Sequence, residues 1–313
     1  MTASSGRSRA SARPRPIVTG GAGFVGSHLV DRLVAEGQQV LVLDDLSSGK
    51  ARNLATGARL EQVDVASDDL HRVFRAWRPT VVFHLAAQAS VSISVREPLR
   101  DLAVNLVGTH RVGVAARASE ASRLVFVSSG GAIYGETVRP ATERTLPAPT
   151  SYYGIHKLAA EGHAAMAGIP YAIARPSNIY GPRQAAGLEG AVVASFVDQA
   201  ARGEPLMIHG DGTQTRDFIH VSDVVEALWR LSRSDVPSGT WNVAAGRSMT
   251  IADLADIVEQ AAGRPLDRAA GPRRAGDVTH SAMSAGRLRG LGWRPSIGAS
   301  AGIGELVKAA IGA

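Results

Sequence analysis

The chain has 313 residues, of which 45% are hydrophobic and 20% charged, a composition typical of a globular protein with one large α/β domain and a smaller one. It contains no cysteine, which excludes a disulfide framework, a cysteine-ligated zinc site and a thiol nucleophile. The formal net charge is +6, but four arginines in the first sixteen residues supply most of it, so the charge does not indicate a nucleic-acid-binding surface.

Residues 1–13 are expected to form a disordered basic tail, because arginines occur there without an acidic residue and with little apolar surface to bury. The tail lacks the apolar segment of a secretory signal. No apolar run elsewhere approaches the roughly 20 residues of a membrane helix. We therefore expect a cytoplasmic protein that binds neither nucleic acid nor a membrane.

Strand-like and helix-like segments alternate over the next part of the chain. Apolar runs predict strands at 17–19, 39–43, 60–63, 81–85, 124–127 and 171–174, and helical spacing predicts helices at 24–36, 68–77, 98–117 and 152–167. Strands alternating with helices of this length indicate βαβ units. We therefore predict an α/β fold with a doubly wound, Rossmann-type parallel sheet over residues 14–176, to which the chain returns near 217–245.

Beyond Pro176 glycine and proline interrupt the pattern, with helices expected at 192–202, 223–231 and 251–261 and a loop at 269–275. Residues 177–313 are predicted to form mainly a smaller α/β lobe. It would close over the carboxyl edge of the sheet, where ligands of open α/β sheets bind.

A glycine-rich turn joins the first strand to the first helix. Gly20, Gly23 and Gly26 have the spacing that permits a tight turn, close approach of a pyrophosphate and packing of helix on strand. The helix N-terminus then offers free N–H groups to the phosphates. Asp44 lies eighteen residues past Gly26, where a carboxylate binds the adenosine ribose and repels a 2′-phosphate. This combination predicts NAD as the cofactor.

Tyr153 and Lys157 lie four residues apart on a predicted helix and so share one face. A free tyrosine has a pKa of about 10 and is a poor base at neutral pH. Lowering this pKa by roughly three units takes about 4 kcal/mol, which a nearby ammonium group can supply. The pair therefore predicts a tyrosine base with a lysine partner.

In its ordered motifs the chain resembles the extended short-chain dehydrogenases/reductases, and within them the nucleotide-sugar epimerases and dehydratases. The resemblance covers nearly the whole chain. It is carried by T-G-G-A-G-F-V-G-S (19–27), D-D-L (44–46), D-V (64–65), H-L-A-A-Q (84–88), N-x-x-G-T (105–109), S-S-G-G-A-I-Y-G (128–135), Y-x-x-x-K (153–157), R-P-S-N-I-Y-G-P-R (175–183), G-D-G-T-Q-T-R-D-F-I-H-V-x-D (210–223) and R-x-G-D (274–277).

The resemblance implies which residues contact the cofactor and which contact the substrate. The expected cofactor contacts are Gly20, Gly23, Phe24, Val25, Gly26, Asp44, Asp45, Leu46, Ser48, Asp64, Val65, Leu85, Ala86, Ala87, Gln88, Asn105, Ser128, Tyr153 and Lys157. The expected contacts to a nucleotide-sugar substrate are Ser129, Asn178, Val192, Val193, Arg216, Arg274, Asp277 and Ser281. No metal is expected. A homodimer built from the helices at 98–117 and 152–167 is the family expectation, although core packing explains their apolar faces equally well.

The residues after the fifth strand indicate which of the family's reactions the protein catalyses. Relatives that dehydrate a sugar carry an Asp-Glu pair at the positions of Gly131 and Ala132, and without acids there elimination lacks its general acid and base. The reaction that needs no such acids is epimerisation: C4 is oxidised, the keto-sugar rotates, and the hydride returns to the other face of C4. Tyr153, Lys157 and Ser129 are its expected catalytic residues. The family's usual Ser or Thr is replaced by Gly130, so Ser129 is expected to supply the hydroxyl, or Tyr153 acts alone.

We therefore predict NAD-dependent 4-epimerisation of a uridine-diphospho-hexose, with glucose/galactose first. The small side chain of Ser281 leaves room for an N-acetyl group. A glucuronate substrate is the rival, for which Arg183 would supply a cation unless it braces its loop. A 4-ketoreductase that releases its cofactor and a nonenzymatic NAD-binding scaffold are further alternatives, of which the intact Tyr153–Lys157 pair disfavours the second.

Overall fold

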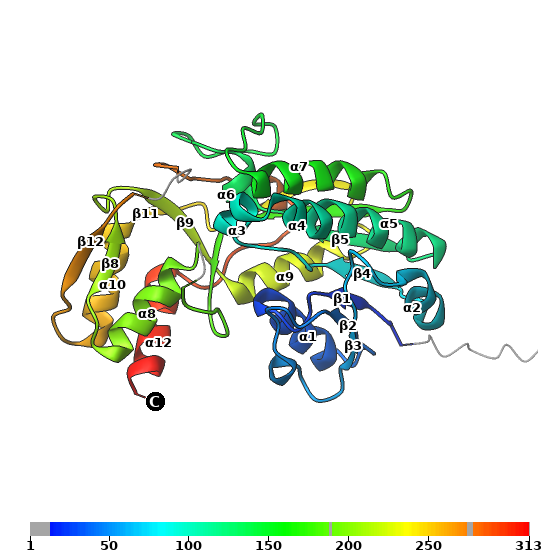
Figure 1. Ribbon diagram of the computed structural model, residues 1–313, viewed down its shortest axis with the longest axis horizontal. Helices are drawn as coiled ribbons and strands as arrows, with labels where there is room; N and C mark the ends of the chain where they lie inside the picture. The colour runs from blue at the N-terminus through cyan, green and yellow to red at the C-terminus, as the bar shows by residue number, and fades with distance from the viewer. Residues whose placement is uncertain (1–12, 188–189, 274–277, 313) are drawn as a thin grey trace, which may run out of the picture.

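The computed structural model describes residues 13–187, 190–273 and 278–312. The predicted basic tail therefore lies almost wholly outside the described residues. Where described, the chain forms a seven-stranded sheet and a smaller lobe (Figure 1).

All seven strands of the large sheet are parallel, which confirms the Rossmann-type fold. Their order is β3-β2-β1-β4-β5-β6-β10. The strands are β1 (Ile17–Thr19), β2 (Leu41–Asp44), β3 (Arg59–Gln62), β4 (Val81–His84), β5 (Arg123–Val127), β6 (Tyr171–Pro176) and β10 (Gly239–Val243). Strand order reverses between β1 and β4, and the crevice at such a switch point is where dinucleotides bind.

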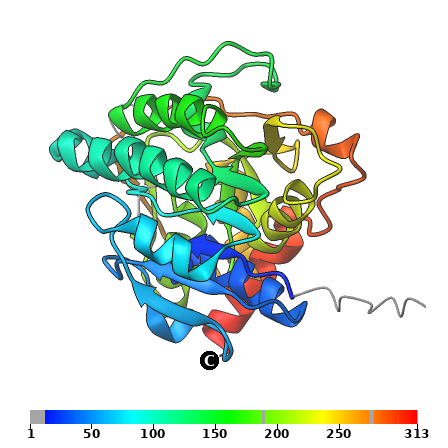
Figure 2. The ribbon, with the colours of Figure 1, turned by 90° about the vertical axis from the view of Figure 1, so that its right-hand side faces the viewer.

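Helices cover both faces of this sheet (Figures 1 and 2). One face carries α2 (Leu70–Trp77), α5 (Gly108–Ala118) and α7 (Tyr152–Ala165), and the other carries α1 (Phe24–Ala35) and α9 (Val221–Leu231). Neighbouring strand residues point to opposite faces, so Ile17 packs in one hydrophobic cluster and Val18 in the other. Because both faces are buried, central strands such as β1, β4 and β5 are short apolar runs without polar alternation.

The helix predicted at 98–117 is present but is not uniform. It consists of α4 (Pro98–Leu102), a π-helical segment η2 (Ala103–Val107) and α5. A π-helical turn inside an α-helix is rare and frequently marks a functional site. Here it contains the buried Asn105.

The smaller lobe has its own core. A two-stranded parallel sheet, β8 (Leu206–His209) with β12 (Arg268–Gly271), packs with α8 (Val192–Arg202), α10 (Ile251–Ala262) and α12 (Ala299–Ile311) around Phe196, Leu254 and Ile303. The loop predicted at 269–275 is therefore wrong for its first part, because β12 gains backbone hydrogen bonds from β8. Its alanines carry no strand signal of their own.

The chain crosses between the two parts more than once. β7 (Asn178–Tyr180), β9 (Thr215–His220) and β11 (Ser248–Thr250) form a three-stranded sheet. After β9 the chain runs through α9 and places β10 beside β6 in the large sheet. Short helices α3 (Val91–Arg96), α6 (Gly130–Ile133) and α11 (Gly286–Arg289) and a 3₁₀ turn (Ala51–Asn53) complete the described elements. None of the described helices is long and apolar enough to cross a membrane.

Candidate active site

The glycine turn after β1 has the geometry that the spacing predicted. Gly20 has φ +69°, and a Cβ there would lie 2.6 Å from the backbone nitrogen of Ala86. At Gly26 a Cβ would collide with the carbonyl oxygen of Gly20. The first turn of α1, which includes Phe24 and Val25, has neither a side-chain cap nor an acidic residue. Its backbone N–H groups and positive dipole end are thus suited to a pyrophosphate.

Asp44 ends β2 beside this turn and is 5% exposed. Its carboxylate accepts hydrogen bonds from the backbone nitrogens of Ala22 and Leu46, each at 2.9 Å. Burial raises the pKa of Asp44, and the two N–H donors oppose that rise. Asp45 and Ser48 lie exposed in the following loop, where Asp45 binds Ser47.

Asp64 and Val65 follow β3. Val65 is buried in the core, while the carboxylate of Asp64 binds the backbone nitrogen of Ala66 and the hydroxyl of Ser67 at 2.8 Å each. Asp64 therefore shapes the loop that is expected to hold the adenine.

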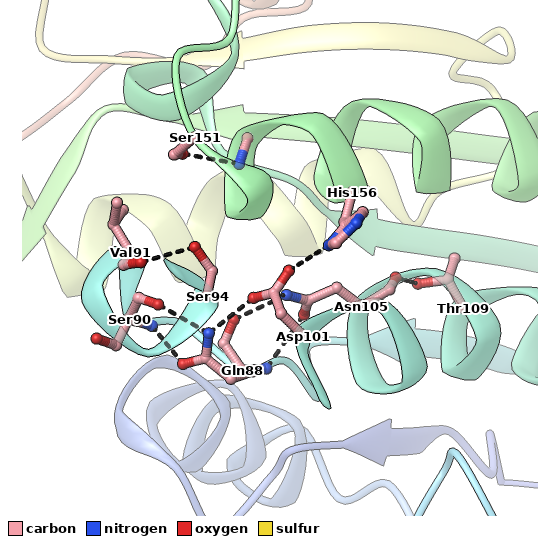
Figure 3. A network of polar contacts seen from close by, with 10 residues as sticks. Gln88, Ser90, Val91, Ser94, Asp101, Asn105, Thr109, Ser151 and His156 are labelled. Atoms are coloured by element: carbon pink, nitrogen blue, oxygen red, sulfur yellow. Dashed lines mark hydrogen bonds and ion pairs between the residues drawn. The ribbon is translucent and has the colours of Figure 1, made fainter. Parts of the chain in front are cut away.

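A polar network lies beyond the end of β4 (Figure 3). After Leu85, Ala86 and Ala87, the buried Gln88 exchanges hydrogen bonds with Asn105: the Gln88 backbone N–H donates to Asn105 Oδ1 at 3.1 Å, and Asn105 Nδ2 donates to the Gln88 carbonyl at 2.9 Å. Both side chains donate to the buried carboxylate of Asp101. The π-helical turn thus brings Asn105 to the switch point of the sheet.

The first two turns of α7 carry Tyr153 and Lys157. The Ser151 hydroxyl caps the helix by accepting from the backbone nitrogen of Gly154 at 3.1 Å. Lys157 is buried, donates to the carbonyl oxygen of Val127 at 2.6 Å and lies 4.4 Å above the centre of the Phe126 ring. The neighbouring Ser128 donates to Glu161 at 2.6 Å on the same helix.

Burial has the largest effect on the pKa values of Tyr153 and Lys157. It raises the pKa of Tyr153 to about 12, against a lowering by the hydrogen bond with the Ser129 hydroxyl. It lowers the pKa of Lys157 to about 7, although Glu161 and Asp101 oppose this. The lowering of the tyrosine pKa by Lys157 stays a prediction, because burial disfavours the charged form of the lysine that this lowering requires.

Ser129 is the hydroxyl that the structure brings to Tyr153. A side chain at residue 130 has no room, since a Cβ on Gly130 would collide with the Met283 side chain and lie 3.1 Å from the carbonyl oxygen of Pro176. Met283 thus fills the space where the family pattern places the hydroxyl.

A cleft of about 440 Å³ lies between the large sheet's carboxyl edge and the lobe. Six predicted residues line it: Ser129, Tyr153, Asn178, Val192, Arg216 and Ser281. The side-chain oxygen of Asn178 is buried there without a hydrogen-bond partner among the described residues, as expected of a ligand contact. Arg216 is 8% exposed and donates to the carbonyl oxygen of Thr215 at 2.8 Å.

Three substrate contacts need comment. Val193 was predicted beside the base, but it packs into the lobe's core, because consecutive helical residues point in different directions and Val192 takes the cleft side. Arg274 and Asp277 lie outside the described residues.

Other cleft residues were not predicted as contacts. Some, such as Gly131, Ser177 and Gln214, lie inside the matched motifs without an assigned contact, and the rest belong to no motif and are brought together only by the fold. Together these cleft residues are Ala89, Val91, Gly131, Ala132, Thr150, Ser151, Ser177, Gly187, Gly190, Ser195, Phe196, Gln199, Met207, His209, Gln214, Ile251 and Val278. No group of three or more His, Asp or Glu within the described ranges is arranged to hold a metal ion.

This chain is similar to known proteins over nearly its whole length. It is 38% identical to a UDP-glucose 4-epimerase of Mycolicibacterium smegmatis over 94% of this chain and 97% of that protein. Its structure is similar to that of a Thermus thermophilus UDP-glucose 4-epimerase in complex with NAD, with a TM-score of 0.90, 39% identity and coverage of 96% of this chain and 99% of that one. A UDP-N-acetylglucosamine 4-epimerase from Methanobrevibacter ruminantium, in complex with UDP-N-acetylmuramic acid, has a TM-score of 0.87 and 32% identity over 96% and 97% of the two chains.

The family model that matches residues 17–244 is described as the NAD dependent epimerase/dehydratase family. This match confirms the resemblance inferred from the motifs and the choice of NAD as cofactor. The chain belongs to the NAD dependent epimerase/dehydratase family.

Proposed function

We propose that the protein catalyses the NAD-dependent 4-epimerisation of a UDP-hexose, with UDP-glucose and UDP-galactose as its first substrates. The observation that carries this proposal is the meeting of Ser129 and Tyr153 at the wall of a cleft that Asn178 and Arg216 also line. The similarity to UDP-glucose 4-epimerases over nearly the whole chain supports the choice of substrate.

The residues present fit the cofactor. The glycine turn and the uncapped helix α1 suit the pyrophosphate, and Asp44 suits the adenosine ribose. Lys157 would bind the nicotinamide ribose. When bound, NAD would supply the acceptor for the C4 hydride and the hydride that is returned.

Tyr153 acts as the acid–base residue. Its phenolic oxygen takes the proton of the C4 hydroxyl and later returns a proton to the 4-keto oxygen after the sugar has turned over in the cleft. The Ser129 hydroxyl stabilises the phenolate by hydrogen bonding, and Lys157 adds positive charge when it is protonated. The hydrogen bond with Ser129 opposes the rise in the Tyr153 pKa that burial causes.

The cleft disfavours elimination chemistry. Gly131 and Ala132, at the positions where dehydrating relatives carry acids, both line the cleft. A C4–C6 elimination would therefore lack an acid and a base at the sugar.

The alternative substrate, UDP-glucuronate, is also less well supported. Arg183, the cation that a C6 carboxylate would need, forms an ion pair with Asp31 of α1 at 2.8 Å. The pair braces the loop after β7, so we keep the neutral hexose as the preferred substrate.

The proposal extends to N-acetylated hexoses. Ser281 is buried at the cleft wall, and Ala89, Gly131 and Ala132 are also small. A 2-acetamido group thus meets no bulky side chain at these positions, and one structural relative is named a UDP-N-acetylglucosamine 4-epimerase.

We further propose a homodimer through α4, α5 and α7. Large apolar side chains are exposed on these helices and next to them, among them Leu99 at 78% and Met166 at 85%, with Val107, Val114 and Ile155 between 40% and 48%. A second copy would bury them. The cytoplasmic location stays a prediction from the sequence.

The test is a comparison of kcat/KM for UDP-glucose, UDP-N-acetylglucosamine and UDP-glucuronate, with NAD⁺ present. We expect the two neutral sugars to be turned over and the uronate to be poor. A uronate preference above about tenfold, or 1.4 kcal/mol of transition-state discrimination, would contradict the proposed substrate. Net, stoichiometric oxidation of NADH with a 4-keto-sugar would instead identify a ketoreductase.

A further inference from the structure

Asp101 is a carboxylate with no exposed surface, held by three donors (Figure 3). Gln88 Nε2 and Asn105 Nδ2 donate to its Oδ1 at 2.7 and 2.9 Å. Its Oδ2 lies 2.6 Å from Nδ1 of His156. Since a carboxylate only accepts, the His156 ring donates from Nδ1, which fixes the orientation of the imidazole.

Burying a carboxylate is costly unless it is both hydrogen-bonded and compensated in charge. The amides of Gln88 and Asn105 are neutral. Among the described residues that hydrogen-bond to Asp101, His156 alone can carry a positive charge. With a side chain 12% exposed, His156 also gives this buried pair its route to solvent protons.

The pair connects the two halves of the active site. Gln88 and Asn105 are expected cofactor contacts, whereas His156 lies on α7 between Tyr153 and Lys157. The negative charge of Asp101 raises the pKa of Tyr153, which makes the phenol a weaker acid and therefore harder to ionise. It also raises the pKa of Lys157.

We propose that His156 is a positioning residue for the epimerisation: its imidazole holds the buried Asp101 carboxylate and offsets its charge, so that Tyr153 can ionise and act as the base. This inference rests on the proposed function. It assigns a role to a residue that is not among those lining the cleft.

The helices that carry this pair also bear other charged and titratable groups. On α7, Tyr152 stacks on the His156 ring with centroids 6.2 Å apart, and Lys157 and Glu161 follow along the helix. On α4, Arg100 is exposed and pairs with Glu97 at 3.1 Å. The Lys157 ammonium donates to Val127, and Glu161 is bound by Arg175 at 2.5 Å, so both have partners of their own.

The test is the pH dependence of kcat for His156→Asn, whose amide keeps a donor near the position of Nδ1 but cannot carry charge. We expect the acid limb of the profile to move up by about 0.5–1 pH unit, because an uncompensated Asp101 raises the Tyr153 pKa. The rate below that limb should fall about three- to tenfold. His71→Asn, an exposed histidine on α2, is the matched control and should leave the profile unchanged.

The double variant Asp101→Asn with His156→Asn separates charge from packing. If charge is the cause, removing the carboxylate returns the limb to the wild-type position or below it. A His156→Asn profile that superimposes on the wild type, or a shift that persists in the double variant, would overturn the proposal.

A second readout does not need turnover. The phenolate absorbance of Tyr153, taken with NAD⁺ bound as the difference between each protein and its Tyr153→Phe partner, should titrate at higher pH in His156→Asn. This measurement remains decisive if the double variant fails to fold. It also separates failure of this inference from failure of the proposed function, which would show as an absence of UDP-hexose turnover in the wild type.

Discussion

At the scale of the residue, the space beside Gly130 explains where the catalytic hydroxyl lies. The Met283 side chain is 2% exposed and occupies the place into which a side chain at 130 would project. The loop therefore presents Ser129 to the phenol. A hydroxyl one position earlier than the family pattern can serve the same proton transfer because the hydrogen bond, and not the sequence position, lowers the tyrosine pKa.

Ser129→Ala removes this hydrogen bond without adding bulk. We predict a loss of kcat by a factor on the order of 10²–10³, with NAD binding unchanged, because the phenolate loses its only described hydroxyl donor. Steady-state kinetics with UDP-glucose measure it. A loss below about threefold would show that Tyr153 works without a hydroxyl partner.

At the scale of the element, the turn β1–α1 and the end of β2 together build the cofactor site. Asp44 holds the backbone of Ala22 in the turn and of Leu46 in the next loop, in addition to its expected contact with the ribose. Its replacement should therefore affect both the ligand and the shape of the turn.

Asp44→Ala is predicted to weaken NAD binding by about tenfold or more, as expected for the loss of charge-assisted hydrogen bonds worth roughly 1.5–3 kcal/mol. Calorimetric titration with NAD and with NADP checks this, with Asp267→Ala, an exposed aspartate of the smaller lobe, as the matched control. A wild-type protein that binds NADP more tightly than NAD would refute the role of Asp44.

Six of the seven strands of the large sheet were predictable because they are apolar runs with a clear end. For β10 only the return of the chain near 217–245 was predicted, since Thr240 and Asn242 interrupt its apolar run. Strands buried on both faces read as apolar runs, and glycine or aspartate marks where they stop. The π-helical turn at Asn105 was not predictable, since the apolar pattern continues through it. Strand β12 was missed because alanine and arginine carry little strand propensity and its partner β8 lies about sixty residues away.

The site was predictable where a motif carries it, as for Gly20, Asp44, Tyr153 and Lys157. The burial of Lys157 was not, and neither was the rise that desolvation causes in the pKa of Tyr153, which is partly exposed at the cleft wall. Residues outside the motifs, such as Thr150 and Ile251, reach the cleft only through tertiary folding, and Asp101 meets His156 across fifty-five positions of sequence.

At the scale of the whole molecule, buried titratable groups make stability depend on pH. His84 has no exposed surface and lies between the hydroxyls of Thr19 and Thr109, at 2.7 and 3.0 Å. Burial lowers its pKa from the ordinary value of 6.5 to about 3. Between these two pH values the unfolded chain binds the proton and the folded protein does not, so the free energy of unfolding falls as the pH is lowered.

His84→Asn should remove this contribution. We predict that urea unfolding of the wild type shows a loss of stability from about pH 6.5 downward, and that the slope is shallower in the variant. Asp217, whose pKa burial raises to about 6, acts in the opposite direction in both proteins. Parallel losses of stability in the two proteins would mean that His84 is not the group responsible.

The reaction itself is tested most directly by following the sugar and the cofactor together. The purified protein is incubated with UDP-glucose and NAD⁺, the sugar is identified by chromatography, and NADH is monitored by absorbance, with Tyr153→Phe as the inactive control. We predict that UDP-galactose accumulates to equilibrium, without net NADH, and only in the wild type. Formation of stoichiometric NADH, a product changed at a carbon other than C4, or full activity of Tyr153→Phe would contradict 4-epimerisation by Tyr153.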